Sequence, residues 1–184
     1  MRYKKSKSLV TIPERFLTQR NRLFSLVGTS LLSITGWKVS GQIPDMKKLL
    51  VVLAPHTSNW DFVYGMALIL SLKIKIYWLG KHSILKKGVT RLLKSLGGIP
   101  VNREDAKNTI NDVLEIAKRE GGILIGLSPE GTRKKAEKWK SGFLRIAQSM
   151  ECPILLVAID YPSKEISFRE LFHPTGDNQR DIEY

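Results

Sequence analysis

The stretch that decides the fold is LLVVLAPHTSNWD, residues 49–61. It opens with a continuous apolar run over 49–54, which has the length of a buried strand. The residues after this run predict a helix over 59–72, with Ser58 or Asn59 as its N-cap. The stretch therefore predicts a buried strand, a short turn and a helix in direct succession.

The rest of the chain continues this alternation of strand-like and helix-like segments. Strands are predicted at 73–79, 99–102, 122–127 and 153–159, and helices at 82–95, 104–119 and 141–150. Segments that alternate in this way indicate an α/β fold. We therefore predict a single domain over residues 41–184, with a mostly parallel or mixed sheet flanked by helices.

Residues 1–40 are predicted to form a basic helical element that associates with membranes. Residues 1–48 carry 10 basic and 2 acidic side chains, a net charge of +8 out of +13 for the whole chain. We expect one amphipathic helix over 13–34, because its polar, basic first half and apolar second half suit the membrane interface. An ordinary amphipathic helix packed on the domain is the alternative.

The composition indicates in which compartment the protein resides and whether it binds a metal. No stretch reaches the roughly 20 apolar residues that span a bilayer. The single cysteine, Cys152, leaves no partner for an intramolecular disulfide and fits a reducing compartment. We therefore expect a peripheral or monotopic protein on the cytoplasmic face of a membrane. One cysteine and three scattered histidines form no metal-ligand pattern, so we expect no metal.

The net charge of +13 favours anionic partners, namely lipid headgroups, nucleic acid or an acidic carrier protein. Aromatic residues interleaved with basic ones are sparse, and no nucleic-acid-binding motif is present. We therefore expect an anionic membrane surface as a partner, and no nucleic acid; a nucleic-acid-binding module is the alternative from another class of protein.

His56 and Asp61 are the candidate catalytic pair, in the pattern HX4D. A histidine titrates near neutrality and can accept a proton from a hydroxyl. An aspartate can hold one ring nitrogen so that the other faces the substrate. The sequence has no G-x-S-x-G motif, and Cys152 lies in an apolar run, so no protein nucleophile is recognisable. The substrate therefore supplies the nucleophile, and a base that activates a substrate hydroxyl against an acyl donor catalyses acyl transfer.

A second motif, SPEGTR, occupies residues 128–133 and follows the predicted strand at 122–127. Pro129 and Gly131 predict a tight turn. Glu130 and Arg133 project from it, and arginine suits bidentate recognition of phosphate. A local Glu–Arg pair in a solvated basic loop is the alternative.

Four polar residues follow four of the predicted strands, namely His56, Lys81, Arg103 and Glu130. In parallel sheets, binding sites lie at the carboxyl ends of the strands. We therefore expect these four side chains to converge on one cleft. Taken singly, Lys81 and Arg103 have the features of solvated surface charges.

Four segments follow one another along the chain in this order: HTSNWD, then GKHS with LGGIPVNR, then SPEGTR, then CPILLVAI. Together they resemble the ordered motifs of the glycerolipid acyltransferase superfamily, the family of 1-acylglycerol-3-phosphate O-acyltransferase. The similarity spans about residues 49–159. It implies an α/β domain with a helical element on the membrane, His56 as general base and Asp61 as its orienting partner. It also implies contacts to the phosphate of the acceptor from Lys81, Arg103, Glu130, Gly131, Thr132 and Arg133.

The resemblance implies transfer of a fatty acyl group from acyl-CoA or acyl-carrier protein to the hydroxyl of a lysolipid, with 1-acylglycerol-3-phosphate expected. It also implies that the reaction needs no metal and no bound cofactor. Three positions depart from the pattern: Pro55 where asparagine is common, Ser128 for an aromatic residue, and Leu156 for a second proline. These changes leave the catalytic pair intact and bear on the acceptor. Another lysolipid or an amino-acid-linked lipid is therefore an alternative acceptor, and a thioester hydrolase is the nearest alternative enzyme.

Overall fold

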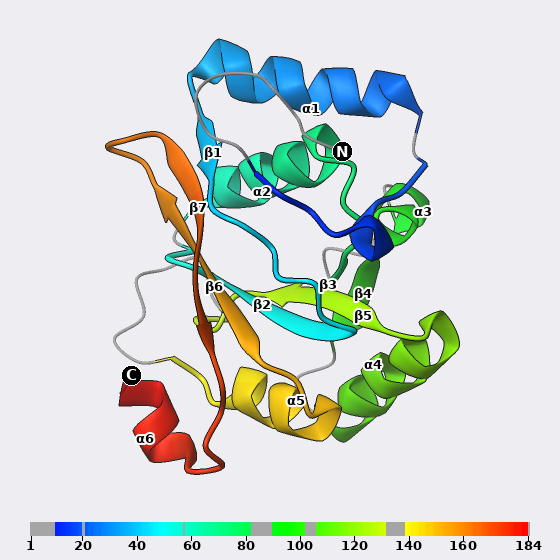
Figure 1. The fold of residues 1–184 in the computed structure, drawn as a ribbon, viewed down its shortest axis with the longest axis vertical. Helices are drawn as coiled ribbons and strands as arrows, with labels where there is room; N and C mark the ends of the chain where they lie inside the picture. The colour runs from blue at the N-terminus through cyan, green and yellow to red at the C-terminus, as the bar shows by residue number, and fades with distance from the viewer. Residues whose placement is uncertain are drawn as a thin grey trace.

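The computed structural model describes residues 10–19, 21–56, 58–81, 90–101, 106–131 and 139–183. Within these ranges, seven strands form one sheet in the order β1-β7-β6-β2-β5-β3-β4, with helices on both faces (Figure 1). The strands are β1 (Lys38–Ser40), β2 (Lys48–Ala54), β3 (Tyr77–Lys81), β4 (Gly98–Val101), β5 (Ile123–Leu127), β6 (Ile154–Asp160) and β7 (Glu165–Phe172). The helices are η1 (Glu14–Phe16, a 3-10 helix), α1 (Arg22–Thr35), α2 (Asn59–Ser71), α3 (Thr90–Ser95), α4 (Ala106–Glu120), α5 (Gly142–Met150) and α6 (Asn178–Glu183).

The sheet is mixed, as predicted. Strand β2 lies between β5 and β6 and is parallel to both, and β3 is parallel to β5 and β4. Helices α2 to α5 connect these parallel strands, because a parallel pair needs a crossover connection. Strands β6 and β7 are antiparallel, since only a short turn joins them. The predicted α/β fold is therefore confirmed.

The central strand β2 is buried on both faces, which explains its unbroken apolar sequence. Leu49 and Val51 belong to a hydrophobic cluster that includes residues of α1 and α2. Leu50 and Val52 point the other way, into a cluster with residues of α4 and α5, because side chains alternate along a strand. Figure 1 shows the same arrangement, with α1 and α2 on one side of the sheet and α4 and α5 on the other.

Helix α1 packs on α2 as an outer layer. A Cβ atom at Gly28 would lie 2.5 Å from the carbonyl oxygen of Ala67, so glycine is required for this close approach. The hydroxyl of Ser25 donates a hydrogen bond to the carbonyl of Ser71, at 3.1 Å. Among the helices of the described residues, none combines the length and apolarity needed to cross a bilayer.

The prediction of one helix over 13–34 is wrong in its first part, where only η1 is helical. The N–H of Thr18 donates to the carbonyl of Lys73 at 2.9 Å, and the N–H of Lys75 donates to the carbonyl of Phe16 at 2.7 Å. These bonds tie the segment to the chain that follows α2. The segment therefore cannot continue as a helix into α1.

Other boundaries also differ from the prediction. The strand expected at 73–79 begins only at Tyr77, because Lys73 takes a left-handed conformation (φ 53°) where α2 ends. The helix expected at 82–95 is α3 in its last part, and residues 82–89 lie outside the described residues. Strands β1 and β7 were not predicted. Both lie at one side of the sheet, where β7 pairs with β6.

Candidate active site

The candidate site lies at the carboxyl ends of β2 and β5, which are neighbours in the sheet. Strand β2 ends at Ala54, and a cis peptide bond joins Ala54 to Pro55 directly before His56. Strand β5 ends at Leu127, which pairs with Val52 in β2. The first and second motifs therefore emerge side by side from one edge of the sheet.

The start of α2 fixes the carboxylate of Asp61. Asp61 is the third residue of the helix, and its Oδ2 accepts a hydrogen bond from the N–H of Ser58 at 2.7 Å. The hydroxyl of Ser58 in turn accepts from the N–H of Trp60 at 3.1 Å, and Ser58 and Asp61 together form a capping box at the start of the helix. The positive end of the helix dipole also favours a carboxylate at this position. Asp61 is completely buried, with 0% of its surface exposed.

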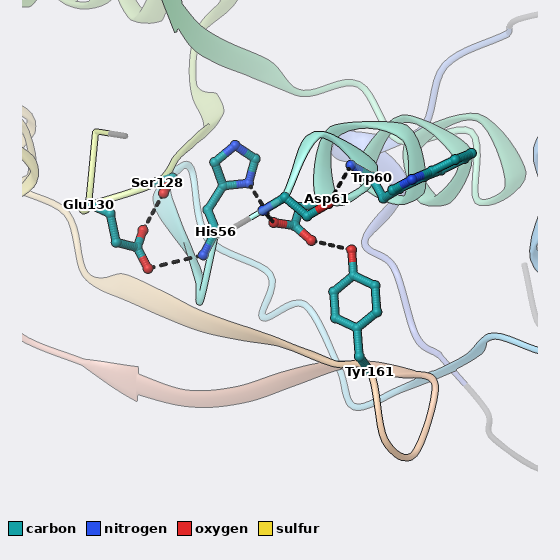
Figure 2. A network of polar contacts seen from close by, with 7 residues as sticks. His56, Trp60, Asp61, Ser128, Glu130 and Tyr161 are labelled. Carbon is teal, nitrogen blue, oxygen red and sulfur yellow. Dashed lines mark hydrogen bonds and ion pairs between the residues drawn. The ribbon is translucent and has the colours of Figure 1, made fainter. Parts of the chain in front are cut away.

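His56 and Asp61 face each other, as the spacing predicted. The Nδ1 atom of His56 lies 3.4 Å from Oδ2 of Asp61 (Figure 2). This Nδ1 is buried and has no hydrogen-bond partner among the described residues. Catalytic hydrogen bonds are often this long before a substrate binds, and shorten afterwards. The other ring nitrogen of His56 points away from Asp61 in Figure 2, so it is the atom that can meet a substrate.

Glu130 holds the backbone of His56. Its Oε1 accepts a hydrogen bond from the N–H of His56 at 3.1 Å, and its Oε2 accepts one from the hydroxyl of Ser128 (Figure 2). The residue is 5% exposed. Both carboxylate oxygens therefore bind groups of the protein, and Glu130 of the second motif holds the backbone of His56 in the first.

Tyr161 is a residue of the site that the sequence reasoning missed. It directly follows β6, and its hydroxyl donates a hydrogen bond to Oδ1 of Asp61 (Figure 2). Burial, followed by the carboxylate of Asp61, raises the pKa of Tyr161 to about 12, because both disfavour the phenolate. The rule that singled out residues after strand ends would have found Tyr161, had it been applied to this strand.

The other predicted site residues are only partly described. Lys81 is exposed and ends β3, which neighbours β5, so it lies on the same edge of the sheet as the candidate pair. Gly131 has a left-handed backbone (φ 60°), and its N–H donates to the carbonyl of Ser128 at 3.4 Å, as a tight turn requires. Three predicted residues lie outside the described residues, namely Arg103, Thr132 and Arg133.

Cys152 does not belong to the site. It is buried before the amino end of β6, at the opposite edge of the sheet from His56. Burial raises the pKa of its thiol to about 11, so the reactive thiolate is disfavoured. Within the described ranges, no three His, Cys, Asp or Glu side chains are grouped to hold a metal ion.

A cavity of about 400 Å³ lies next to the strands that carry the site. Its walls are mostly apolar, and they come from β2, β6, β7 and Trp139. The lining residues are Val52, Ala54, Trp139, Leu156, Val157, Ala158, Arg169 and Glu170. The cavity therefore adjoins the carboxyl end of the strand that leads to His56.

Known proteins resemble this chain in fold and in sequence family. The crystal structure of the 1-acyl-sn-glycerophosphate (LPA) acyltransferase PlsC from Thermotoga maritima has a similar fold, with a TM-score of 0.63. The two chains are 21% identical, and the match covers 88% of this chain and 75% of that one. No curated protein matches the chain. The family described as Acyltransferase matches residues 36–160, which include His56, Asp61 and Glu130. The prediction of an acyltransferase is thus confirmed, and the chain belongs to the Acyltransferase family.

Proposed function

We propose that the protein is a membrane-surface O-acyltransferase that moves a fatty acyl group from a thioester to the hydroxyl of a lysolipid. The observation that carries this proposal is the His56–Asp61 pair, with Nδ1 directed at a buried carboxylate and the other nitrogen left for a substrate. The family supports the acyl transfer. The Thermotoga maritima protein, described as an LPA acyltransferase, supports 1-acylglycerol-3-phosphate as the acceptor.

In the proposed reaction, Nε2 of His56 takes the proton of the acceptor hydroxyl as its oxygen attacks the thioester carbonyl. Asp61 stabilises the imidazolium that forms, through Oδ2. The tetrahedral intermediate then expels the thiolate, which takes the proton back from His56, so the products are an ester and a thiol. General base catalysis of this kind contributes about 10²- to 10⁴-fold to the rate.

Two further features fit the proposed substrates. Lys81 supplies a positive charge at the same edge of the sheet as the pair, which suits the phosphate of the acceptor. We assign the same role to Arg103, Thr132 and Arg133 from the family resemblance. The apolar cavity beside β2 and β6 suits the acyl chain of the donor, which is acyl-CoA or acyl-carrier protein.

The outer face of α1 supports binding to a membrane surface. Leu23, Leu26, Val27 and Ile34 are between 60% and 84% exposed, and their spacing puts them on one face of the helix. Gly28 lies on the opposite face, against α2. Such an exposed apolar stripe suits binding to a lipid interface. We therefore propose that α1 docks the protein on the membrane in which the lysolipid resides.

The reaction is tested by acyl transfer from long-chain acyl-CoA and acyl-carrier protein to a panel of lysolipids, read by mass spectrometry. We expect a diacyl product that is lost in His56→Ala and retained in His173→Ala. His173 is the matched control, because it is exposed and follows β7, whose carboxyl end lies at the other edge of the sheet. Free fatty acid without acylated lipid would show a thioester hydrolase instead. Acylation of an amino-acid-linked lipid alone would replace the proposed acceptor.

Membrane docking is tested with vesicles that contain phosphatidylglycerol. We expect the double substitution Leu26→Glu and Val27→Glu to release the protein from these vesicles, because it places two charges in the apolar stripe. Lys118→Glu changes the net charge equally on the exposed side of α4, and should keep binding nearly intact. Equal loss in both variants would point to the overall charge rather than to α1.

A further inference from the structure

We infer that Tyr161 is a positioning residue for the proposed reaction: its hydroxyl holds the carboxylate of Asp61 in the orientation that presents Oδ2 to His56. The inference rests on the proposed function, since it assigns a role within the same site. Tyr161 lies outside the four sequence motifs, and it reaches Asp61 from 100 residues away in the sequence.

The two oxygens of Asp61 have different partners. Oδ2 accepts from the N–H of Ser58 at 2.7 Å and lies 3.4 Å from Nδ1 of His56. Oδ1 accepts from the hydroxyl of Tyr161. The terminal torsion of an aspartate has a broad energy minimum, so the capping bond alone leaves the carboxylate plane free to turn. The second bond, on the other oxygen, fixes that plane.

Tyr161 is itself held in place by an aromatic cluster. Its ring makes an edge-to-face contact with Trp37, with the centroids 5.1 Å apart, and lies 6.3 Å from the ring of Tyr64. Trp37 and Tyr64 also contact each other, at 4.4 Å. Trp37 follows α1, and Tyr64 lies in α2. The position of the hydroxyl is therefore set by three segments that meet over the site.

The turn after Tyr161 binds the end of α1. Lys164 Nζ donates to the carbonyl of Thr35 at 3.1 Å, and the N–H of Lys38 donates to the carbonyl of Lys164 at 2.8 Å. The N–H of Lys164 donates to the carbonyl of Tyr161 at 3.2 Å, which closes the turn. Tyr161 therefore connects the proposed membrane helix to the proposed catalytic pair. The ordinary pKa of 10.0 already keeps a tyrosine hydroxyl protonated through the neutral range, and the raised pKa of Tyr161 extends its role as a donor to higher pH.

The test is a double-mutant cycle on Tyr161 and Asp61. In Tyr161→Phe the ring and its packing stay, and the hydrogen bond is lost. We expect kcat to fall about 10- to 100-fold, the effect of one hydrogen bond to a charged group, while the KM of both substrates stays within about twofold. In an Asp61→Asn background the same substitution should have almost no further effect, because residues that act through one another are not additive.

Tyr77→Phe is the matched control. It removes a hydroxyl that donates to a carboxylate, Oε1 of Glu120 at 3.0 Å, at the start of β3 and so at the opposite edge of the sheet. We expect its kcat to match that of the unmodified protein. The melting temperature of each variant is measured alongside, and a loss of kcat that follows melting temperature in both tyrosine variants would overturn the inference.

The outcomes separate this inference from the proposed function. Loss of turnover in Asp61→Asn together with normal turnover in Tyr161→Phe would overturn the inference alone. An equal loss on substituting Tyr161 in both backgrounds would also overturn it, because the tyrosine would then not act through Asp61. Normal turnover in Asp61→Asn would overturn the proposed pair and the inference with it.

Discussion

Two tyrosine–carboxylate hydrogen bonds lie at opposite edges of the sheet. At the carboxyl edge, Tyr161 donates to Asp61, which is fully buried at the start of α2. At the amino edge, Tyr77 donates to Glu120, whose side chain is 22% exposed. Glu120 also accepts from Lys75 Nζ at 2.6 Å and from Arg119 at 3.2 Å.

The difference lies in what balances the negative charge. Two cationic side chains and solvent surround Glu120, so its cluster is a surface ion pair with a small effect on stability. Asp61 is held by hydrogen bonds and a helix amino end, and its other neighbour is a histidine. The buried carboxylate of Asp61 beside a histidine is typical of a catalytic site. The carboxylate of Glu120 between two cations is typical of a surface ion pair.

The largest expected difference between the two sites is in kcat, when the charge of Asp61 or of Glu120 is removed. Asp61→Asn should lower kcat by about 10²- to 10⁴-fold, because the imidazolium of His56 loses its stabilising charge and the ring loses its orientation. Glu120→Gln should leave kcat within about twofold, as expected for a surface pair remote from the site. Steady-state acyl transfer by both variants measures the contrast. Similar kcat values for Asp61→Asn and Glu120→Gln would contradict the proposed difference between the two carboxylates.

Glu130 offers the next largest effect, on stability as well as activity. Glu130→Ala leaves the N–H of His56 without its acceptor, and should cost about 1–3 kcal/mol in the free energy of unfolding. Glu130→Gln keeps one acceptor oxygen and should cost less. Urea unfolding measures both costs, and kcat should fall in the same order. If Glu130→Ala raises only the KM of the acceptor, the residue binds substrate as the family resemblance implies.

The ionisation of Tyr161 gives a smaller, spectroscopic effect. Burial, then the hydrogen bond to Asp61 and then the charge of Asp61 together raise the pKa of Tyr161 to about 12. Asp61→Asn removes the charge and keeps the burial, so the pKa of Tyr161 should fall but stay above its ordinary value of 10.0. The tyrosinate absorbance of each protein, minus that of its Tyr161→Phe counterpart, isolates this titration. An unchanged pKa would show that Asp61 does not reach the hydroxyl in solution.

The smallest expected effect is that of Glu120, at the amino edge of the sheet, on stability at acidic pH. The hydrogen bonds from Lys75, and then from Tyr77, lower the pKa of Glu120 from 4.5 to about 2. A lowered folded-state pKa stabilises the protein above the unfolded-state value, and this contribution is lost as the pH falls from 4.5 toward 2. Glu120→Gln should therefore narrow the difference in unfolding free energy between neutral and acidic pH, by less than about 1 kcal/mol. An identical pH profile for the two proteins would contradict this.

Much of the site was predictable because its signals are local. The spacing of His56 and Asp61 reflects a strand end, an N-cap at Ser58 and the third position of a helix, all within one short stretch. Glu130 was predicted as a site residue for a different reason, as a substrate contact. Its hydrogen bond to the backbone of His56 joins residues 74 apart in the sequence, and no local pattern announces such a bond.

The N-terminal segment shows where local patterns misled. An amphipathic pattern predicted a helix from residue 13, but hydrogen bonds to the chain after α2 hold that part in η1 and an extended segment. Trp37, at the end of the apolar half, is 7% exposed, because it packs in the core against Tyr64 and Tyr161. Long-range contacts therefore overrode the local preference.

The sequence by itself determined the α/β fold, the pairing of His56 with Asp61 and the edge of the sheet where the motifs meet. These follow from hydrophobic periodicity, helix capping and the common direction of parallel strands, which are short-range or general constraints. Only the tertiary structure decided that Glu130 braces His56 and that Tyr161 reaches Asp61. Both depend on the strand order, which sets β5 and β6 on either side of β2 and so brings distant residues to one carboxylate and one backbone N–H.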